Sequence, residues 1–352
     1  MEYVFYMNTK ISILLYSLLH FLVDGICSLV IWSRLYNGGS LQSSILFITY
    51  NVLAFCTQPL FGLLIDKYNN KNRLFLFISI LLLILGVLFS FQYIISAVLL
   101  GIGNSIFHIT GGKFVICKTN NDIVSLGIFV APGALGLVIG KYIISLVTWI
   151  IFLSLLIIFT VLLMFFDKNE ELECKRKNIV FSNKIMKSIV LVIILVVLLR
   201  SFVGSSNIFT FDKNIFILIL MGAFTMIGKM LGGVLSKYFG INITIISTMI
   251  ISLICFIFFN NNLYVALLGI LLFNCSMPIT LCLMNELFPK LEGFSFGLLA
   301  SFLIPGYLLG TFNYGENLLK VLIIISCILS IILVMLSNTV IKRRSGVYLW
   351  KY

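Results

Sequence analysis

The stretch Gly62-Leu-Leu-Ile-Asp-Lys-Tyr68 closes an apolar run, and its pattern returns 170 residues later as Gly232-Gly-Val-Leu-Ser-Lys-Tyr238. Each copy has a glycine, three apolar or small residues, one polar residue, a lysine and a tyrosine. Each copy also ends the second apolar run of its half of the chain. A repeat in equivalent positions predicts that the chain consists of two related halves.

The composition places the chain in a membrane. Of 352 residues, 61% are hydrophobic and only 10% are charged, and the mean hydropathy is +1.16. A soluble domain is about one quarter charged, so the apolar residues here must face lipid. Stretches of about 20 apolar residues can span a bilayer. Twelve are predicted: 11–33, 43–65, 74–91, 93–116, 123–140, 143–166, 188–209, 214–236, 241–260, 263–285, 293–312 and 317–340.

These stretches predict an all-α integral membrane protein with twelve transmembrane helices in two six-helix bundles. The predicted division is an N-terminal bundle at 1–166, a charged linker at 167–187, a C-terminal bundle at 188–340 and a tail at 341–352. Duplicated halves of six spans are one of the architectures of membrane transporters. We therefore expect the chain to be embedded in a lipid bilayer.

The basic residues predict the orientation. The net charge of +12 would suggest nucleic acid in a soluble protein, but here lysine and arginine lie between apolar runs. Placing the N-terminus inside leaves seventeen of the 24 basic residues in the cytoplasm and four outside. By the positive-inside rule, both termini are cytoplasmic. We expect a monomer in the inner membrane of a bacterium, with no nucleic-acid partner.

The sequence contains no pattern typical of an enzyme or of a metal site. It has no P-loop, so an ATP-driven pump is not indicated, and no GxSxG, HExxH or paired-carboxylate motif. Nearly all of the eight cysteines lie in apolar runs, without a CxxC or Cys/His cluster. We therefore expect them to be small buried residues rather than metal ligands or disulfide partners. No cofactor and no metal are expected.

Two histidines and one aspartate are the first candidates for chemistry inside the membrane, where ionisable residues are costly. His20 and Asp24 lie four residues apart near the middle of the first span, on one helical face. An imidazole beside a carboxylate can exchange a proton at physiological pH, so the pair predicts a proton-coupling site. His108, in the fourth span, is expected to face the same cavity. The alternatives are a structural pair and a histidine satisfied by packing.

Arg200 and Asn274 are the candidates for solute contact. Arg200 lies near the centre of the seventh span and, since it stays charged, needs an anionic partner. That partner is a carboxylate or phosphate of the solute, or a protein group. Asn274 precedes Pro278, whose ring distorts the tenth span, and it either lines a polar path or bonds a neighbouring helix. Lys113 and Lys229 are expected to snorkel from the cytoplasmic ends.

The fifth span carries Ala131-Pro-Gly-Ala-Leu-Gly136, with Gly127 and Gly140 on either side. Small residues at this spacing predict a close helix contact, which could also slide.

The motif after the second span resembles the signature loop of the major facilitator superfamily, G-x-x-x-D-R/K-x-G-R/K-R/K. The matching positions are Gly62, Asp66, Lys67 and Lys71 in the first half and Gly232 and Lys237 in the second. Asn69 and Asn70 depart from the pattern, and Ser236 replaces the acid. The resemblance implies that Asp66 and Lys67 help to latch the two bundles together on the cytoplasmic side.

Within that superfamily, the chain resembles the fosmidomycin resistance protein group. The likeness rests on His20 and Asp24, on Gln58-Pro59, on Asp66-Lys67-Tyr68 and on Phe107-His108. That group often continues with Pro-Glu, where this chain has Ile109-Thr110. The superfamily implies a central cavity lined by spans 1, 4, 7 and 10, which hold the candidates named above.

Together these observations predict a secondary transporter that moves a small solute, anionic in character, by alternating access. We expect proton-coupled efflux of a drug or metabolite, with protons exchanged at Asp24. A metabolite uniporter or symporter is the alternative within transport. A membrane sensor or scaffold without transport is the alternative of another class.

Overall fold

The computed structural model describes residues 2–36, 40–166, 172, 174 and 183–345. Within these ranges every regular element is a helix. Twelve helical spans there are long and apolar enough to cross a membrane, which confirms the twelve predicted stretches to within a few residues at each end. The predicted linker at 167–187 and the tail at 341–352 lie largely outside the described residues, although α8 already begins at Asn183.

The elements of the first six spans are α1 (Glu2–Val30), η1 (Ile31–Leu35), α2 (Leu41–Asn51), η2 (Val52–Cys56), α3 (Gln58–Lys67), η3 (Asn69–Lys71), α4 (Asn72–Leu88), α5 (Tyr93–Lys118), α6 (Ile123–Tyr142) and α7 (Leu146–Phe166). Those of the last six are α8 (Asn183–Ser205), α9 (Ile215–Phe239), α10 (Ile241–Phe258), α11 (Leu263–Asn274), α12 (Ser276–Leu287), α13 (Glu292–Ser301), α14 (Leu303–Gly310) and α15 (Glu316–Ser345).

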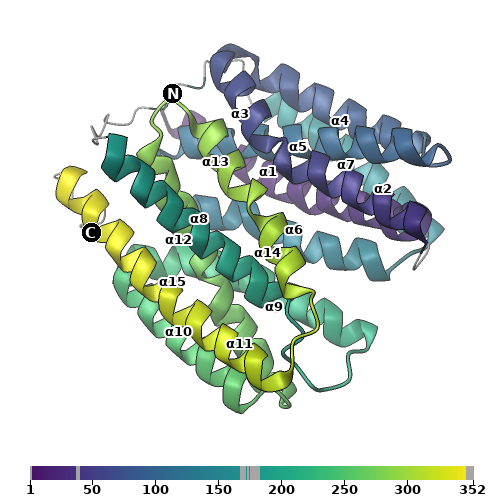
Figure 1. Ribbon diagram of the computed structural model, residues 1–352. Coiled ribbons are helices and arrows are strands. Elements are labelled where there is room, and N and C mark those ends of the chain that lie inside the picture. Colours follow the sequence, from purple (N-terminus) through teal and green to yellow (C-terminus); the bar gives the residue numbers. More distant parts are fainter. Residues whose placement is uncertain (1, 37–39, 167–171, 173, 175–182, 346–352) are drawn as a thin grey trace. The chain divides into compact units, whose positions relative to one another are not determined.

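The chain forms two compact units (Figure 1). Unit 1 comprises Met1–Asn121, Ile128–Lys175 and Lys290–Ser301. Unit 2 comprises Asp122–Gly127, Arg176–Pro289 and Phe302–Tyr352. The eleventh span is therefore shared, because α13 packs within unit 1 and α14 within unit 2. The first turn of α6 is likewise grouped with unit 2.

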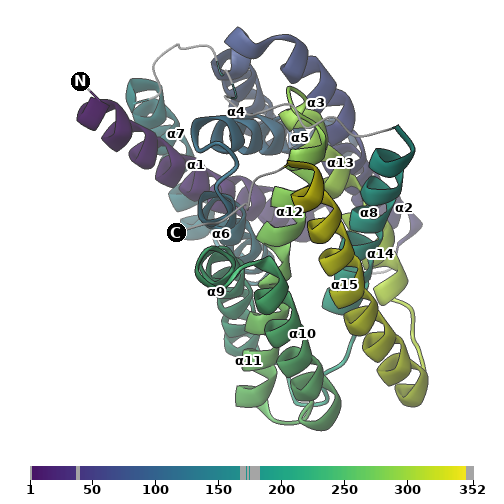
Figure 2. The same cartoon turned by 90° about the vertical axis from the view of Figure 1, so that its left-hand side faces the viewer.

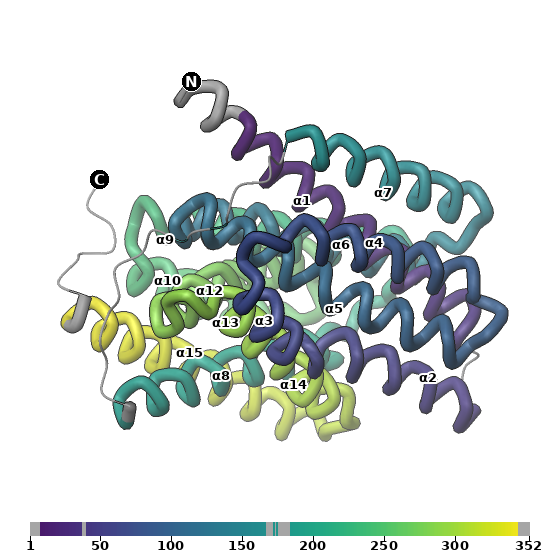
Figure 3. The backbone as a smooth tube through the Cα atoms, turned by 90° about the horizontal axis from the view of Figure 1, so that it is seen from above, coloured from purple at the N-terminus to yellow at the C-terminus, as the bar shows by residue number. Residues whose placement is uncertain are grey.

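Unit 1 is organised around α5. Every residue of α5 from Gly103 to Cys117 is buried, and the helix packs against α1, α2, α3, α4 and α13. The amphipathic pattern of a surface helix is absent from this stretch, as expected of a helix covered on all sides. Seen from above, α7 runs alongside α1 on the opposite side of that helix from much of the unit (Figure 3).

Unit 2 contains a layer of neighbouring helices in which α11 packs against both α9 and α10 (Figure 2). Helix α15 packs against α8 and α10, and α14 packs against α8. Many large apolar side chains on the outside of both units are exposed, as lipid-facing residues are.

Prolines divide two of the spans at positions that matter for the site. Pro59 lacks the N–H that a regular helix needs, and the preceding turn, η2, widens to a π-helix. The side-chain amide of Gln58 donates to the carbonyl of Ala54 at 2.8 Å, which satisfies a group in the widened turn. Pro278 follows the break at Cys275 between α11 and α12, as the sequence predicted for this span.

Candidate functional site: a buried histidine–aspartate cluster

Three ionisable side chains meet inside unit 1. The Nε2 atom of His20 lies 3.2 Å from a carboxylate oxygen of Asp24, one helical turn away on α1. The Nε2 atom of His108, on α5, lies 3.5 Å from the other oxygen and 2.9 Å from Nε2 of His20. Each residue is at most 7% exposed. The structure thus brings together the three residues that the sequence singled out for proton coupling.

The two histidine rings are held in one tautomer by the backbone. Nδ1 of His20 donates to the carbonyl of Phe129 at 2.8 Å, and Nδ1 of His108 donates to the carbonyl of Asn104 at 2.9 Å. A carbonyl oxygen can only accept, so each Nδ1 must carry the hydrogen. In the neutral tautomer that results, Nε2 presents a lone pair.

This arrangement places two imidazole nitrogens and a carboxylate within hydrogen-bond reach of one another. Two neutral rings would place two lone pairs at hydrogen-bond distance, beside the carboxylate of Asp24, with no hydrogen between them. The repulsion is relieved when one Nε2 or the carboxylate is protonated and donates to its neighbour.

The surroundings of Asp24 were only partly foreseen. Nδ2 of Asn104 donates to Asp24 at 3.3 Å and to the hydroxyl of Tyr50 at 3.0 Å. Gly133, on α6, lies so close that any side chain there would collide with the Asp24 carboxylate and the His20 ring. The glycines of this span predicted close packing, but sequence gave no signal that Phe129 or Tyr50 would complete the cluster.

Arg200 lies in unit 2, within α8. It is 9% exposed and donates from one guanidinium nitrogen to the hydroxyl of Thr280, on α12, at 3.0 Å. Among the described residues this is its single hydrogen bond, and it forms no ion pair there. A guanidinium has five N–H donors, so most of its capacity and its whole charge are left for another group.

Asn274 ends α11 in the same unit. Its side-chain amide donates to the carbonyl of Ile270 in its own helix at 2.8 Å, and the side chain is half-buried. This local bond is the usual one for a polar residue in a membrane helix. A role for Asn274 in solute contact remains a prediction.

The first copy of the repeated motif forms a buried junction between α3 and α13. The two carboxylate oxygens of Asp66 accept from the backbone N–H groups of Gly293 and Phe294, at 2.9 and 2.8 Å. These groups open α13, where the helix dipole favours an anion. Gly62 lets the helices approach, because a side chain there would strike the backbone of Gly293. We call this contact the α3–α13 junction.

Lys113 completes that junction and corrects one prediction. We expected Lys113 to snorkel, but it is fully buried. Its ammonium lies 3.1 Å from Asp66 and donates to the carbonyl of Ile65 and the side chain of Asn69. Burial of an unpaired ammonium would be costly, and the carboxylate of Asp66 compensates for it.

The other motif residues lie in more open positions. Lys67 and Lys71 are exposed, and their ammonium groups lie over the ring of Tyr68, at 5.7 and 5.2 Å from its centre. In the second copy, Gly232 is buried against the backbone of Cys275. Lys237 forms an exposed ion pair with Asp122 at 3.4 Å.

The cysteines correct a second prediction, because Cys117 and Cys174 form a disulfide. The sulfur atoms and the carboxylate of Glu292 lie within 4.8 Å of one another, a spacing that a metal ion could use. The His20–Asp24–His108 cluster has the same property. In the first group the disulfide occupies the sulfur atoms.

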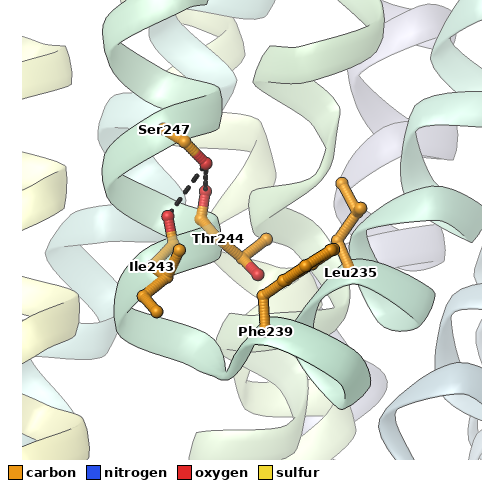
Figure 4. Close-up of a pocket in the computed structure, with 5 residues that line it drawn as sticks. All are labelled: Leu235, Phe239, Ile243, Thr244 and Ser247. Atoms are coloured by element: carbon orange, nitrogen blue, oxygen red, sulfur yellow. Dashed lines mark hydrogen bonds between the residues drawn. The ribbon is translucent and has the colours of Figure 1, made fainter.

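A groove of about 250 Å³ between α9 and α10 is unsuited to a polar solute (Figure 4). It is lined by Leu235, Phe239, Ile243, Thr244 and Ser247. Both hydroxyl groups donate to carbonyls of their own helix, from Thr244 to Gly240 and from Ser247 to Ile243, so neither hydrogen is left for a ligand.

The described residues form a helical membrane fold with buried ionisable groups in its spans. The sequence matches the family model of the Major Facilitator Superfamily over residues 11–311. The chain belongs to this superfamily, and it is a multi-pass membrane protein and a secondary transporter of small molecules.

Solved structures agree on the fold. The chain is similar to the outward conformation of the superfamily transporter FucP, with a TM-score of 0.68 and 12% identity over 95% of this chain and 99% of that one. It is also similar to a variant of the E. coli fucose:proton symporter FucP, with a TM-score of 0.64 and 12% identity over 92% and 97% of the two chains. A comparison with curated proteins gives no match.

Proposed function

We propose that this transporter couples the export of a small anionic solute to the entry of protons, by alternating access. The observation that carries the proposal is the 2.9 Å approach of the His20 and His108 Nε2 atoms beside Asp24. With both Nδ1 atoms bound to carbonyls, the cluster needs a bound cation, and a proton fits it. A site that must gain and lose one proton can link a proton gradient to a conformational cycle.

In this proposal, Asp24 and the two histidines bind a proton from outside and release it to the cytoplasm. Arg200 binds an anionic group of the solute, and Asn274 contributes a polar contact. The support for Arg200 is that, within the described part of the chain, this buried guanidinium makes a single hydrogen bond, whereas a bidentate carboxylate or phosphate would stabilise it. The protein works as a monomer with both termini in the cytoplasm.

The test uses protein reconstituted in liposomes with a trapped pH dye and an imposed proton gradient. A panel of small anions and drugs is added to wild type and to Asp24→Asn. We expect one class of compound to move protons with wild type and not with the variant. Asp122→Asn is the matched control, because it neutralises a carboxylate outside the cluster and should retain coupling. Full coupled transport by Asp24→Asn would refute the proposal.

A uniporter or symporter is the second candidate. FucP is described as a fucose:proton symporter, and its 12% identity supports the shared fold and not a shared sugar substrate. Counterflow of a labelled solute without any change in the dye signal favours a uniporter. Proton movement in the same direction as the solute favours a symporter. A sensor or scaffold would give neither signal with any compound.

A further inference from the structure

We propose that the Cys117–Cys174 disulfide is a reversible clasp that fixes Cys174, which follows α7, to the end of α5, next to the first turn of α13. When the disulfide forms, it restrains α13. When it is reduced, α13 is released. This inference goes beyond the proposed function and does not depend on which ion or solute is carried.

The location of the cysteines carries the proposal. Cys117 lies in the last turn of α5 and is buried, whereas Cys174 is half-buried in the segment that follows α7. Glu292, whose carboxylate lies within 4.8 Å of both sulfur atoms, is the first residue of α13 and is 3% exposed. The clasp thus lies against the helix start that binds Asp66.

The covalent distances show what the clasp changes. Sixteen residues, 167–182, separate the end of α7 at Phe166 from the start of α8 at Asn183. An extended chain of this length reaches about 60 Å. Once Cys174 is fixed to α5, only the eight residues 175–182 lie between this fixed point and the start of α8, and they reach about 30 Å. The clasp therefore halves the length of chain between its fixed end and α8.

The same end of α5 makes the clasp responsive to a reductant. The distribution of basic residues predicts that this end faces the cytoplasm, where thiols are normally kept reduced. A thiolate of a cellular dithiol would attack Sγ of Cys174, the more accessible sulfur, and form a mixed disulfide. Cys117 leaves as a thiolate and takes up a proton. The second thiol of the reductant then attacks the mixed disulfide, frees Cys174 and leaves the reductant as a disulfide.

Formation of the clasp from the two thiols removes two electrons and two protons, so an oxidant is needed to form it again.

The test follows the backbone of α13 in the full-length protein in liposomes. Differential alkylation with mass spectrometry measures the pairing of Cys117 with Cys174, and hydrogen–deuterium exchange measures residues 292–301. We expect several-fold slower exchange in oxidised protein than after treatment with dithiothreitol. Cys174→Ser should show the faster exchange under both conditions.

Cys56→Ser is the matched control, because it removes another accessible thiol outside the pair and should behave as wild type. Two results would overturn the proposal. One is alkylation of both Cys117 and Cys174 in protein treated with an oxidant. The other is equal exchange of residues 292–301 in the oxidised and reduced protein. Neither readout requires a transported solute, so this test can fail or succeed independently of proton coupling.

Discussion

The two copies of the repeated motif solve the same packing problem with different chemistry. In the first copy, Asp66 accepts two backbone N–H groups at the start of α13 and pairs with the buried Lys113. In the second copy, the position of the acid is held by Ser236, which is fully buried and whose hydroxyl has no hydrogen-bond partner among the described residues. The ion pair there is formed one residue later, by Lys237, at the surface.

This difference indicates that the acid, Asp66, and its partner, Lys113, occur as a pair. The residue 170 positions after Lys113 is Leu283, which is fully buried. Without a cation at that place, a carboxylate at position 236 would be buried and unpaired, at a cost of several kcal/mol. In both copies a glycine lets the backbones of two helices pack closely, and this close packing is what the shared motif encodes. The buried charges are an addition to the first copy alone.

The largest effect is expected from removing the charge of Asp66 in the α3–α13 junction. Asp66→Asn leaves the ammonium of Lys113 buried without its partner, which should lower the free energy of unfolding by about 3–5 kcal/mol. Ser236→Ala is the matched change in the second copy and should be neutral or slightly stabilising, because it removes an unsatisfied hydroxyl. Thermal unfolding in detergent measures both. Equal losses in the two variants would contradict the comparison.

A double substitution tests whether Asp66 and Lys113 stabilise the protein as a pair. Asp66→Ser with Lys113→Leu gives the first copy the residues of the second. We expect the double variant to be more stable than either single variant, with a coupling free energy of about 2–3 kcal/mol, because neither charge is left alone. A loss equal to the sum of the single losses would show that the two side chains act independently.

The sequence predicted the spans, the repeat and the cluster residues because each depends on local pattern. Twenty apolar residues in a row, or a histidine four residues before an aspartate, can be read without a fold. The partners of Lys113 and the pairing of Cys117 with Cys174 could not be read in this way. Each joins positions more than 40 residues apart, and a lysine near a helix end gives the same signal whether it snorkels or is buried.

The next effect concerns two glycines of α6 that are grouped with different units. Gly133→Ala places a methyl group against Asp24 and His20, whereas Gly127→Ala places one against the backbone carbonyl of Lys229. Both should cost about 1–3 kcal/mol of stability through overpacking. We expect only Gly133→Ala to disturb proton binding, measured as a shift in the pH dependence of transport. An equal shift in Gly127→Ala would show that the pH dependence of transport does not come from the cluster.

The smallest effects are expected at the exposed ion pair of the second copy, between Lys237 and Asp122. Asp122 accepts from the backbone N–H of Ser125 at 3.0 Å and so caps α6, in addition to pairing with Lys237. Asp122→Ala should therefore cost about 1 kcal/mol, as the loss of a helix cap does. Lys237→Gln removes only the exposed ion pair, whose lysine is 48% exposed, and should cost less than about 0.5 kcal/mol.

Chemical unfolding of the two variants in parallel measures this difference, and raising the salt concentration should remove what remains of the Lys237 effect, since salt screens exposed charges. If Lys237→Gln lowered the free energy of unfolding as much as Asp66→Asn, the surface ion pair would stabilise the protein as much as the buried one. The second copy would then be a junction of equal strength, and the asymmetry between Asp66 and Ser236 would have no energetic meaning.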